Sequence, residues 1–239
     1  MRSDSIDLVI FDCDGVLIDS EVVSARVIVE MLAMEGVLID LEYVYKHFLG
    51  RQFSCVGRTV LENFAIRLPE SFEADYRHAL LSAFEEELKI TTGLKDVLSS
   101  LNVPNCVATS SSRQRTQGAL ELVGLTDHFG NRIFTASDVK HGKPAPDLFL
   151  FTSEVMQVQP KNCLVIEDSL MGIEAALVAG MRVWRYTGAS HLSSTTGELK
   201  GQFSQVPVFD DWAAIFAMEP ALQKLNTLLE NQNDNQISG

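Results

Sequence analysis

The feature that most constrains the fold is a regular alternation of helical and apolar extended segments after Thr92. Apolar runs cover residues 105–109, 132–135, 163–166 and 181–186, and helical patterns cover 93–101, 114–123, a segment starting at Pro146, and 170–179. Short apolar runs of this kind are typical of strands buried on both faces. Strands that alternate with helices pair in parallel, with helices covering both faces of the sheet. The sequence therefore predicts an α/β fold built on a doubly wound, Rossmann-like parallel sheet.

One more strand is expected near the N-terminus, far from the others in sequence. Residues 6–11 are mostly apolar, whereas residues 22–34, 56–68 and 72–88 have apolar side chains at helical spacing. No convincing strand occurs between Glu21 and Lys89. We expect an α/β core formed by residues 1–18 and 90–226, with a helical domain of residues 19–89 inserted after the first strand. Residues 227–239 are polar, which is typical of a disordered tail.

Composition narrows the classes of function. The chain has 239 residues, of which 46% are hydrophobic, so it can bury a substantial core. A net charge of −13 argues against nucleic acid or an anionic membrane as a partner. The four cysteines are scattered without a paired spacing, which favours reduced thiols in a cytoplasmic protein; they are Cys13, Cys55, Cys106 and Cys163. We expect a cytoplasmic monomer that acts on a small molecule.

Two carboxylates follow the first predicted strand directly. Asp12 and Asp14 lie two residues apart, and Gly15 lets the chain turn after them. Two negative charges at the end of a buried strand are costly unless a cation joins them. The pair therefore predicts a metal site, and one of the two aspartates is also a candidate nucleophile.

Polar residues follow other predicted strands as well. Thr109 begins a run of hydroxyl residues, Glu167-Asp168 ends a later strand, and Lys143 lies in a proline-rich turn before a helix. Taken singly, the first two segments suit helix N-caps and the lysine suits a solvated loop. In a doubly wound sheet, however, ligands bind beyond the carboxyl ends of the strands. Carboxylates, a hydroxyl and a lysine gathered there suit a hard divalent cation and a phosphoryl group.

The same residues carry a family resemblance. Asp12-Cys13-Asp14-Gly15-Val16, Thr109, Lys143-Pro144 and Glu167-Asp168 resemble the four ordered motifs of the haloacid dehalogenase superfamily. The helical insert resembles the helical cap of members that carry one after the first strand. Within that superfamily, the chain resembles the β-phosphoglucomutase-like sugar-phosphate phosphatases in two segments, Asp19-Ser20-Glu21 and the run from Lys143 to Phe149.

The resemblance implies roles for the aspartates and a cofactor. Asp12 would be the nucleophile that forms an aspartyl-phosphate, and Asp14 would be the general acid and then the general base. Mg²⁺ would be held by Asp12, the backbone carbonyl of Asp14 and Asp168. Glu167 would hold a metal-bound water from outside the ligand set.

The resemblance also implies groups that bind the phosphate and the substrate. Thr109 and the backbone N–H of Ser110 would donate to phosphoryl oxygens, and Lys143 would neutralise charge on the phosphoryl group and the nucleophile. In the cap, Gly50, Arg51 and Gln52 resemble the substrate-specificity loop, although a solvent-exposed connection between helices remains the alternative. Further candidates are Glu21, which would face the cap, and two arginines that would either reach a second anionic group or be solvated, Arg113 and Arg115.

The function expected from these residues is an Mg²⁺-dependent phosphatase. Its substrate would be a small phosphorylated metabolite, either a phosphosugar or a phosphosugar acid such as 6-phosphogluconate. The alternative is a sugar-phosphate mutase of the β-phosphoglucomutase type. That activity is disfavoured because Gln52-Phe53 follows Arg51 where a Ser-Arg pair would be expected, and because Ser24 takes the expected place of a cap histidine.

Overall fold

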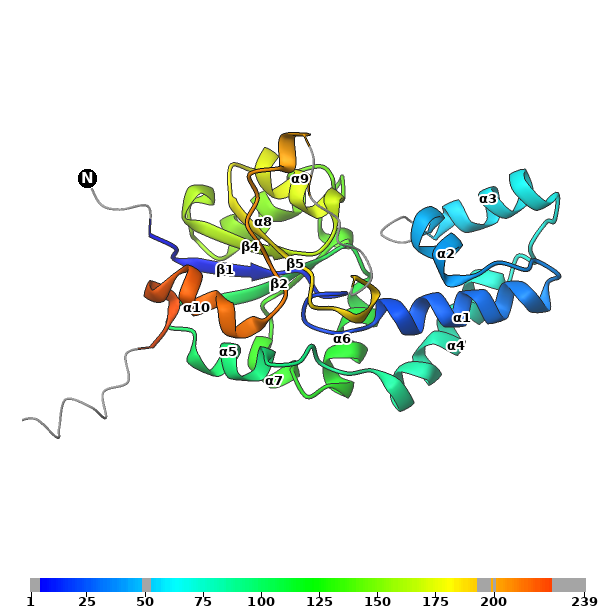
Figure 1. Ribbon diagram of the computed structural model, residues 1–239, viewed down its shortest axis with the longest axis horizontal. Coiled ribbons are helices and arrows are strands. Elements are labelled where there is room, and N and C mark those ends of the chain that lie inside the picture. The colour runs from blue at the N-terminus through cyan, green and yellow to red at the C-terminus, as the bar shows by residue number, and fades with distance from the viewer. Residues whose placement is uncertain (1–4, 49–52, 193–198, 200, 225–239) are drawn as a thin grey trace, which may run out of the picture.

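The core is a six-stranded, fully parallel sheet (Figure 1). The computed structural model describes residues 5–48, 53–192, 199 and 201–224. The strand order is β3-β2-β1-β4-β5-β6. The strands are β1 (Leu8–Phe11), β2 (Asn105–Thr109), β3 (Ile133–Thr135), β4 (Cys163–Glu167), β5 (Arg182–Tyr186) and β6 (Val208–Phe209). The predicted α/β fold with a parallel sheet is confirmed.

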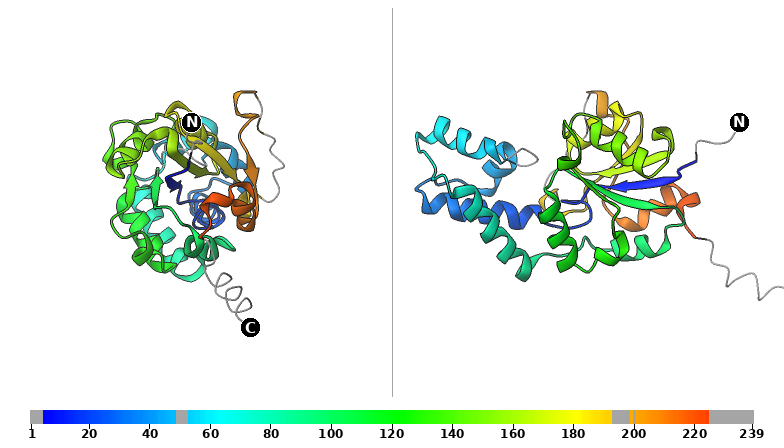
Figure 2. Two further views of the ribbon diagram at one scale, coloured as in Figure 1. Left: turned by 90° about the vertical axis from the view of Figure 1, so that its left-hand side faces the viewer. Right: turned by 180° about the vertical axis from the view of Figure 1, so that it is seen from behind.

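Helices cover both faces of the sheet, because alternate strand residues point to opposite sides. Leu8 and Ile10 of β1 pack into one hydrophobic cluster, and Val9 and Phe11 pack into another. Figures 1 and 2 show two helices over the first face, α8 (Asp147–Val155) and α9 (Leu170–Val178). The opposite face is covered by α5 (Leu94–Ser100), α6 (Arg113–Leu122), α7 (Thr126–Phe129) and α10 (Ile215–Met218).

The connections change sides of the sheet next to β1. The chain passes from β2 to β3 through α6 and α7 on one face, whereas it passes from β3 to β4 and on to β5 through α8 and α9 on the other. The carboxyl ends of β1 and β4 therefore meet at a topological switch point. Crevices at such points are where open α/β sheets bind ligands.

A block of four helices lies beyond the carboxyl end of β1 (Figure 1). Its helices are α1 (Glu21–Met34), α2 (Leu41–His47), α3 (Ser54–Phe64) and α4 (Phe72–Glu87). They share a hydrophobic cluster of their own, which includes Ile28, Val60 and Phe72. α4 also contacts α6 of the core, and α1 contacts the short turn Ser190–Leu192 that follows β5. The helical block thus borders the same end of the sheet as the switch point.

Short elements account for most differences from the sequence-based expectation. α2, α7, α10 and β6 were not expected, and each has seven residues or fewer. Their boundaries depend on local contacts: the Asp40 side chain, for instance, accepts the backbone N–H of Tyr43 and begins α2.

Three further features concern the cysteines, membrane-spanning helices and the C-terminal residues. All four cysteines are buried thiols. In the part of the chain that the structure describes, no helix is long and apolar enough to cross a membrane. The expected disordered tail, residues 227–239, lies outside the described residues.

Candidate active site

The turn after β1 places Asp12 and Asp14 at the switch point. Gly15 has φ +76°, in the left-handed region that favours glycine. A Cβ atom at Gly15 would lie 2.1 Å from Asp168 Oδ2 and 2.9 Å from His191 Cε1. Glycine is therefore needed both for the backbone conformation and for the close approach of the Asp168 carboxylate.

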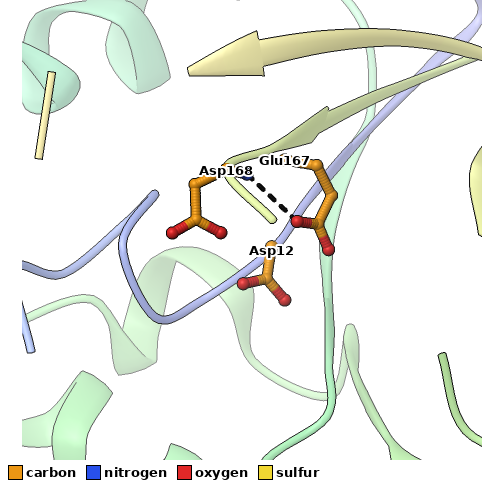
Figure 3. Close-up of side chains that lie close together, drawn as sticks. All are labelled: Asp12, Glu167 and Asp168. Atoms are coloured by element: carbon orange, nitrogen blue, oxygen red, sulfur yellow. Dashed lines mark hydrogen bonds between the residues drawn. The ribbon is translucent and has the colours of Figure 1, made fainter. Parts of the chain in front are cut away.

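Three buried carboxylates come together at this end of the sheet (Figure 3). Asp12 follows β1, Glu167 ends β4 and Asp168 comes next, and one oxygen of each lies within 4.8 Å of the others. Burial raises the pKa of Asp12 well above its usual range, although Lys143 opposes this. Burial and the charge of Glu167 likewise raise the pKa of Asp168. The cluster thus gathers more negative charge than the surrounding protein stabilises.

Lys143 bridges two of these carboxylates. Its Nζ donates to Asp12 Oδ1 and to Glu167 Oε1, each at 2.6 Å, and to the carbonyl oxygen of Ala108 at 2.9 Å. Its side chain is only 3% exposed. Burial lowers the pKa of Lys143, but the two carboxylates outweigh burial and raise it, so the lysine is charged at neutral pH. One fixed positive charge therefore partly compensates the three acidic groups.

Glu167 is held by donors on every side. Besides Lys143, it accepts the backbone N–H groups of Asp168 and Ser169 and the Ser169 hydroxyl, each at 3.0 Å. The Gly172 position on α9 makes room for it, since a Cβ atom there would lie 1.7 Å from Glu167 Oε1. The Glu167 side chain is thus fixed in place by hydrogen bonds.

The three carboxylates fit a divalent cation. All the donor atoms are oxygens, which Mg²⁺ and similar hard cations prefer. A cation bound by these carboxylates would stabilise the ionised forms of Asp12 and Asp168, which burial disfavours. The Asp14 side chain is outside this cluster because its carboxylate faces other groups; the expected role of its backbone carbonyl remains a prediction.

Asp14 is held by an arginine and two serines. Arg115 Nη1 donates to its Oδ2 at 2.7 Å, and Nη2 donates to its Oδ1 at 2.9 Å. The Ser20 hydroxyl donates to Oδ1 at 2.5 Å, and the Ser111 hydroxyl donates to Oδ2 at 2.6 Å. Burial raises the pKa of Asp14, but the Arg115 charge and the serine hydrogen bonds prevail and lower it. In this arrangement Asp14 is an ionised, fully paired carboxylate.

The end of β2 lies at the same edge of the sheet. Thr109 ends β2 and is 1% exposed, and its Oγ1 accepts the backbone N–H of Ser111 at 3.1 Å. Ser110, between them, is exposed. Thr109 and Ser110 therefore lie at the carboxyl end of the strand adjacent to β1, as expected, and their contacts with a phosphoryl group remain a prediction.

The other candidate residues do not all lie near the motif carboxylates. Glu21 begins α1, and its pKa is raised to about 8 because of burial and the neighbouring charge of Asp14. Arg113 points away from the motif carboxylates: it pairs with Asp138 at 2.7 Å and is 43% exposed. Gly50, Arg51 and Gln52 lie outside the described residues.

Sequence reasoning did not single out the two serines that bind Asp14, Ser20 and Ser111, or the histidine beside Asp168. His191 lies after β5, is 5% exposed, and places Nε2 at 3.2 Å from Asp168 Oδ2. Burial lowers the pKa of His191, so the ring is neutral at pH 7. A single histidine far from the other motifs gives no sequence signal.

Comparison with known proteins agrees with this geometry. Residues 6–180 match the family model described as haloacid dehalogenase-like hydrolase. The chain is 30% identical to the 6-phosphogluconate phosphatase of Escherichia coli K12, over 78% of this chain and 85% of that protein. It is 32% identical to the fructose-1-phosphate phosphatase of the same organism, over 72% of this chain and 92% of that protein.

A solved structure extends the likeness. A haloacid dehalogenase family hydrolase from Deinococcus radiodurans, crystallised with bound phosphate and sodium, superposes with a TM-score of 0.75. It is 29% identical, and the match covers 93% of this chain and 99% of that one. The four motifs, the fold and these relatives lead to one conclusion: the chain belongs to the haloacid dehalogenase-like hydrolases and is a phosphatase of that family.

Proposed function

We propose that this protein hydrolyses the phosphate monoester of a small sugar or sugar acid, with Mg²⁺ as cofactor and an aspartyl-phosphate on Asp12 as intermediate. The observation that carries the proposal is the position of Asp12. Its carboxylate lies at the switch point between Lys143, 2.6 Å away, and two further buried carboxylates. The two Escherichia coli phosphatases described above act, by name, on a phosphosugar acid and a phosphosugar.

In the first step, a carboxylate oxygen of Asp12 attacks phosphorus and the bond from phosphorus to the leaving oxygen breaks. Lys143 is positioned to offset negative charge on the nucleophile and on the phosphoryl group together. Thr109 and the Ser110 N–H would donate to the phosphoryl oxygens. A bound Mg²⁺, held by Asp12 and Asp168 with Glu167 beside them, would screen the repulsion between the two anions.

Asp14 handles the protons. It would give a proton to the leaving alkoxide in the first step, and take one from the water that hydrolyses the aspartyl-phosphate in the second. Asp14 is ionised while Arg115 binds both of its oxygens, so it must leave Arg115 and take up a proton from solvent before it can give one to the leaving alkoxide. A loss of halide would need no such proton donor, so the Asp12–Asp14 pair supports phosphoryl transfer.

The helical block would serve as the cap over this crevice. Its helix α4 contacts α6, which carries Arg115, and α1 begins at Glu21 beside Asp14. Closure of such a cap excludes water from the site and brings its own residues to the substrate. We also propose that Gly50, Arg51 and Gln52 of the cap contact the substrate.

A mutase remains the second candidate named by the sequence, and the chemistry of Ser24 weighs against it. Ser24 is buried on α1 where a cap histidine would be expected, and a serine hydroxyl is a poor acid or base at neutral pH. With β-glucose 1-phosphate as substrate, a mutase would yield glucose 6-phosphate, whereas a phosphatase yields free glucose and phosphate.

The decisive experiment combines a nucleophile variant with metal removal. Asp12→Asn should lower phosphate release from p-nitrophenyl phosphate and from 6-phosphogluconate by at least about 10³-fold, while the circular dichroism spectrum stays unchanged. EDTA should silence the wild-type enzyme and Mg²⁺ should restore it. Wild-type rates in Asp12→Asn would refute the assignment of the nucleophile, and full activity in EDTA would refute the metal.

A further inference from the structure

Arg115 is a partly buried cation at the junction of the core and the helical block. Its side chain is 21% exposed, and its guanidinium carbon lies 5.4 Å from the centroid of the Phe84 ring on α4. Burial lowers the pKa of Arg115, but the charges of Asp14 and Glu21 raise it further, so the group is always charged. A permanent, partly buried positive charge in this position is stabilised by an anionic partner at each stage of the reaction.

The present partner of Arg115 is Asp14, and the proposed reaction takes that partner away. Both terminal nitrogens of the guanidinium donate to the Asp14 carboxylate, at 2.7 and 2.9 Å. When Asp14 turns to the leaving oxygen, the guanidinium loses both of these hydrogen bonds. Losing that carboxylate is unfavourable for a partly buried arginine, so a second anion that takes the place of Asp14 would be bound favourably.

No described neighbour of Arg115 is suited to replace Asp14. Glu21 is the other carboxyl whose charge acts on Arg115, but its pKa is raised to about 8, mainly by burial, so it is neutral at pH 7. The Nε atom of Arg115 is buried and has no acceptor among the described residues. The guanidinium therefore has unused binding capacity beside the site of the leaving group.

The neighbouring arginine on the same helix shows that this arrangement is particular to Arg115. Arg113 is 43% exposed and pairs with Asp138 at 2.7 Å, and it also donates to the carbonyl oxygen of Ile133 at 3.2 Å. Its pairing ties the start of α6 to the loop after β3 and leaves it away from Asp14. Arg113 is thus a matched control for the role of Arg115.

We propose that Arg115 binds a carboxylate on the leaving group, and that this contact selects phosphorylated sugar acids over neutral phosphosugars. A planar carboxylate fits the guanidinium fork through two parallel hydrogen bonds, as the Asp14 carboxylate now does. The protonated Glu21 would donate to an adjacent substrate hydroxyl. This inference rests on the proposed phosphatase function and narrows its substrate to one chemical class.

The test compares two substrates that differ in one group. 6-Phosphogluconate carries a carboxylate at C1, and glucitol 6-phosphate carries a hydroxymethyl group there. The wild-type kcat/KM should favour the acid by about 10- to 100-fold, the effect of one charge-assisted pair. Arg115→Met should reduce this ratio to near 1. Any effect of the substitution on Asp14 would lower kcat/KM for both substrates equally and would leave the ratio unchanged. Arg113→Met should keep the wild-type ratio.

A binding measurement keeps the test independent of turnover. Calorimetric titration of Asp12→Asn with each compound in the presence of Mg²⁺ should show the same preference for the acid, and Asp12→Asn/Arg115→Met should lose it. Arg115→Lys, which keeps the charge but not the fork, should retain part of the preference. Thermal melting of each variant establishes that it is folded.

The outcomes separate the inference from the proposed function. If Arg115→Met lowers kcat/KM equally for both compounds and the ratio survives, Arg115 only positions Asp14 and the inference is overturned. Equal wild-type kcat/KM values for the acid and the neutral compound also overturn it, with the phosphatase function intact. If no phosphorylated compound releases phosphate, the proposed function itself fails.

Discussion

Replacing Lys143 by methionine tests whether one buried charge holds the carboxylate cluster together. The lysine is 3% exposed and contacts Asp12 and Glu167 at 2.6 Å each. Asp12 has no other side-chain donor in the described part of the chain, whereas Glu167 keeps two backbone N–H groups and a serine hydroxyl. Most of the lost free energy of unfolding should therefore come from the unpaired Asp12 carboxylate. Breaking a buried ion pair of this kind costs about 3–5 kcal/mol, so Lys143→Met should lose that much free energy of unfolding at pH 8 without metal.

The loss should shrink as the pH falls. Burial already raises the pKa of Asp12 and of Asp168 well above their usual range, and removal of the lysine raises the pKa of Asp12 further. Carboxyls with raised pKa values destabilise the fold when they are ionised, and this effect disappears on protonation. At pH 5.5 the deficit of the variant should therefore be well under half of its value at pH 8.

Tryptophan fluorescence during urea unfolding is the assay. Both tryptophans, Trp184 and Trp212, are buried in the core, so their emission reports unfolding of the α/β domain. Lys95→Met, at an exposed position on α5, is the matched control and should be close to wild type at both pH values. Saturating Mg²⁺ should restore about 2–3 kcal/mol to Lys143→Met. An equal loss at pH 5.5 and pH 8, or no gain with Mg²⁺, would refute the electrostatic reasoning.

Two further variants test the surroundings of the site. Glu21→Gln should be nearly as stable as wild type at pH 5 and more stable by up to about 4 kcal/mol at pH 9 in EDTA, because the pKa of Glu21 is raised from 4.5 to about 8 and its ionisation opposes folding; thermal melts that shift equally at both pH values would contradict this. Gly172→Ala should lose about 3 kcal/mol in urea unfolding, since its Cβ would lie 1.7 Å from Glu167 Oε1. Gly118→Ala on α6, where nothing lies within 4 Å of a Cβ, should instead gain up to about 1 kcal/mol from helix propensity, and equal effects of the two alanines would count against a steric role for Gly172.

The main elements of the fold could be predicted because their signals are local. β2 is an apolar run, and its observed bounds Asn105–Thr109 coincide with the predicted segment. β6 has two residues and α7 has four, which is too short for any periodicity to develop. Their positions depend on contacts with distant parts of the chain: β6 pairs with β5, for example.

For the site, the sequence by itself determined the chemistry, and the tertiary structure decided the partners. Asp12, Asp14, Thr109, Lys143 and Glu167-Asp168 could be identified because parallel strands bring their carboxyl ends to one edge, so that polar residues after apolar runs must meet there. The sequence could not show whether Arg113 or Arg115 faces the site. Residues two positions apart on a helix point in directions about 200° apart, so only one of the two can face it. Only the packing of α6 against the sheet and α4 directs Arg115 to Asp14 and Arg113 to Asp138. His191 likewise reaches Asp168 only because β4 and β5 are neighbours, an adjacency that sheet pairing creates and sequence spacing does not record.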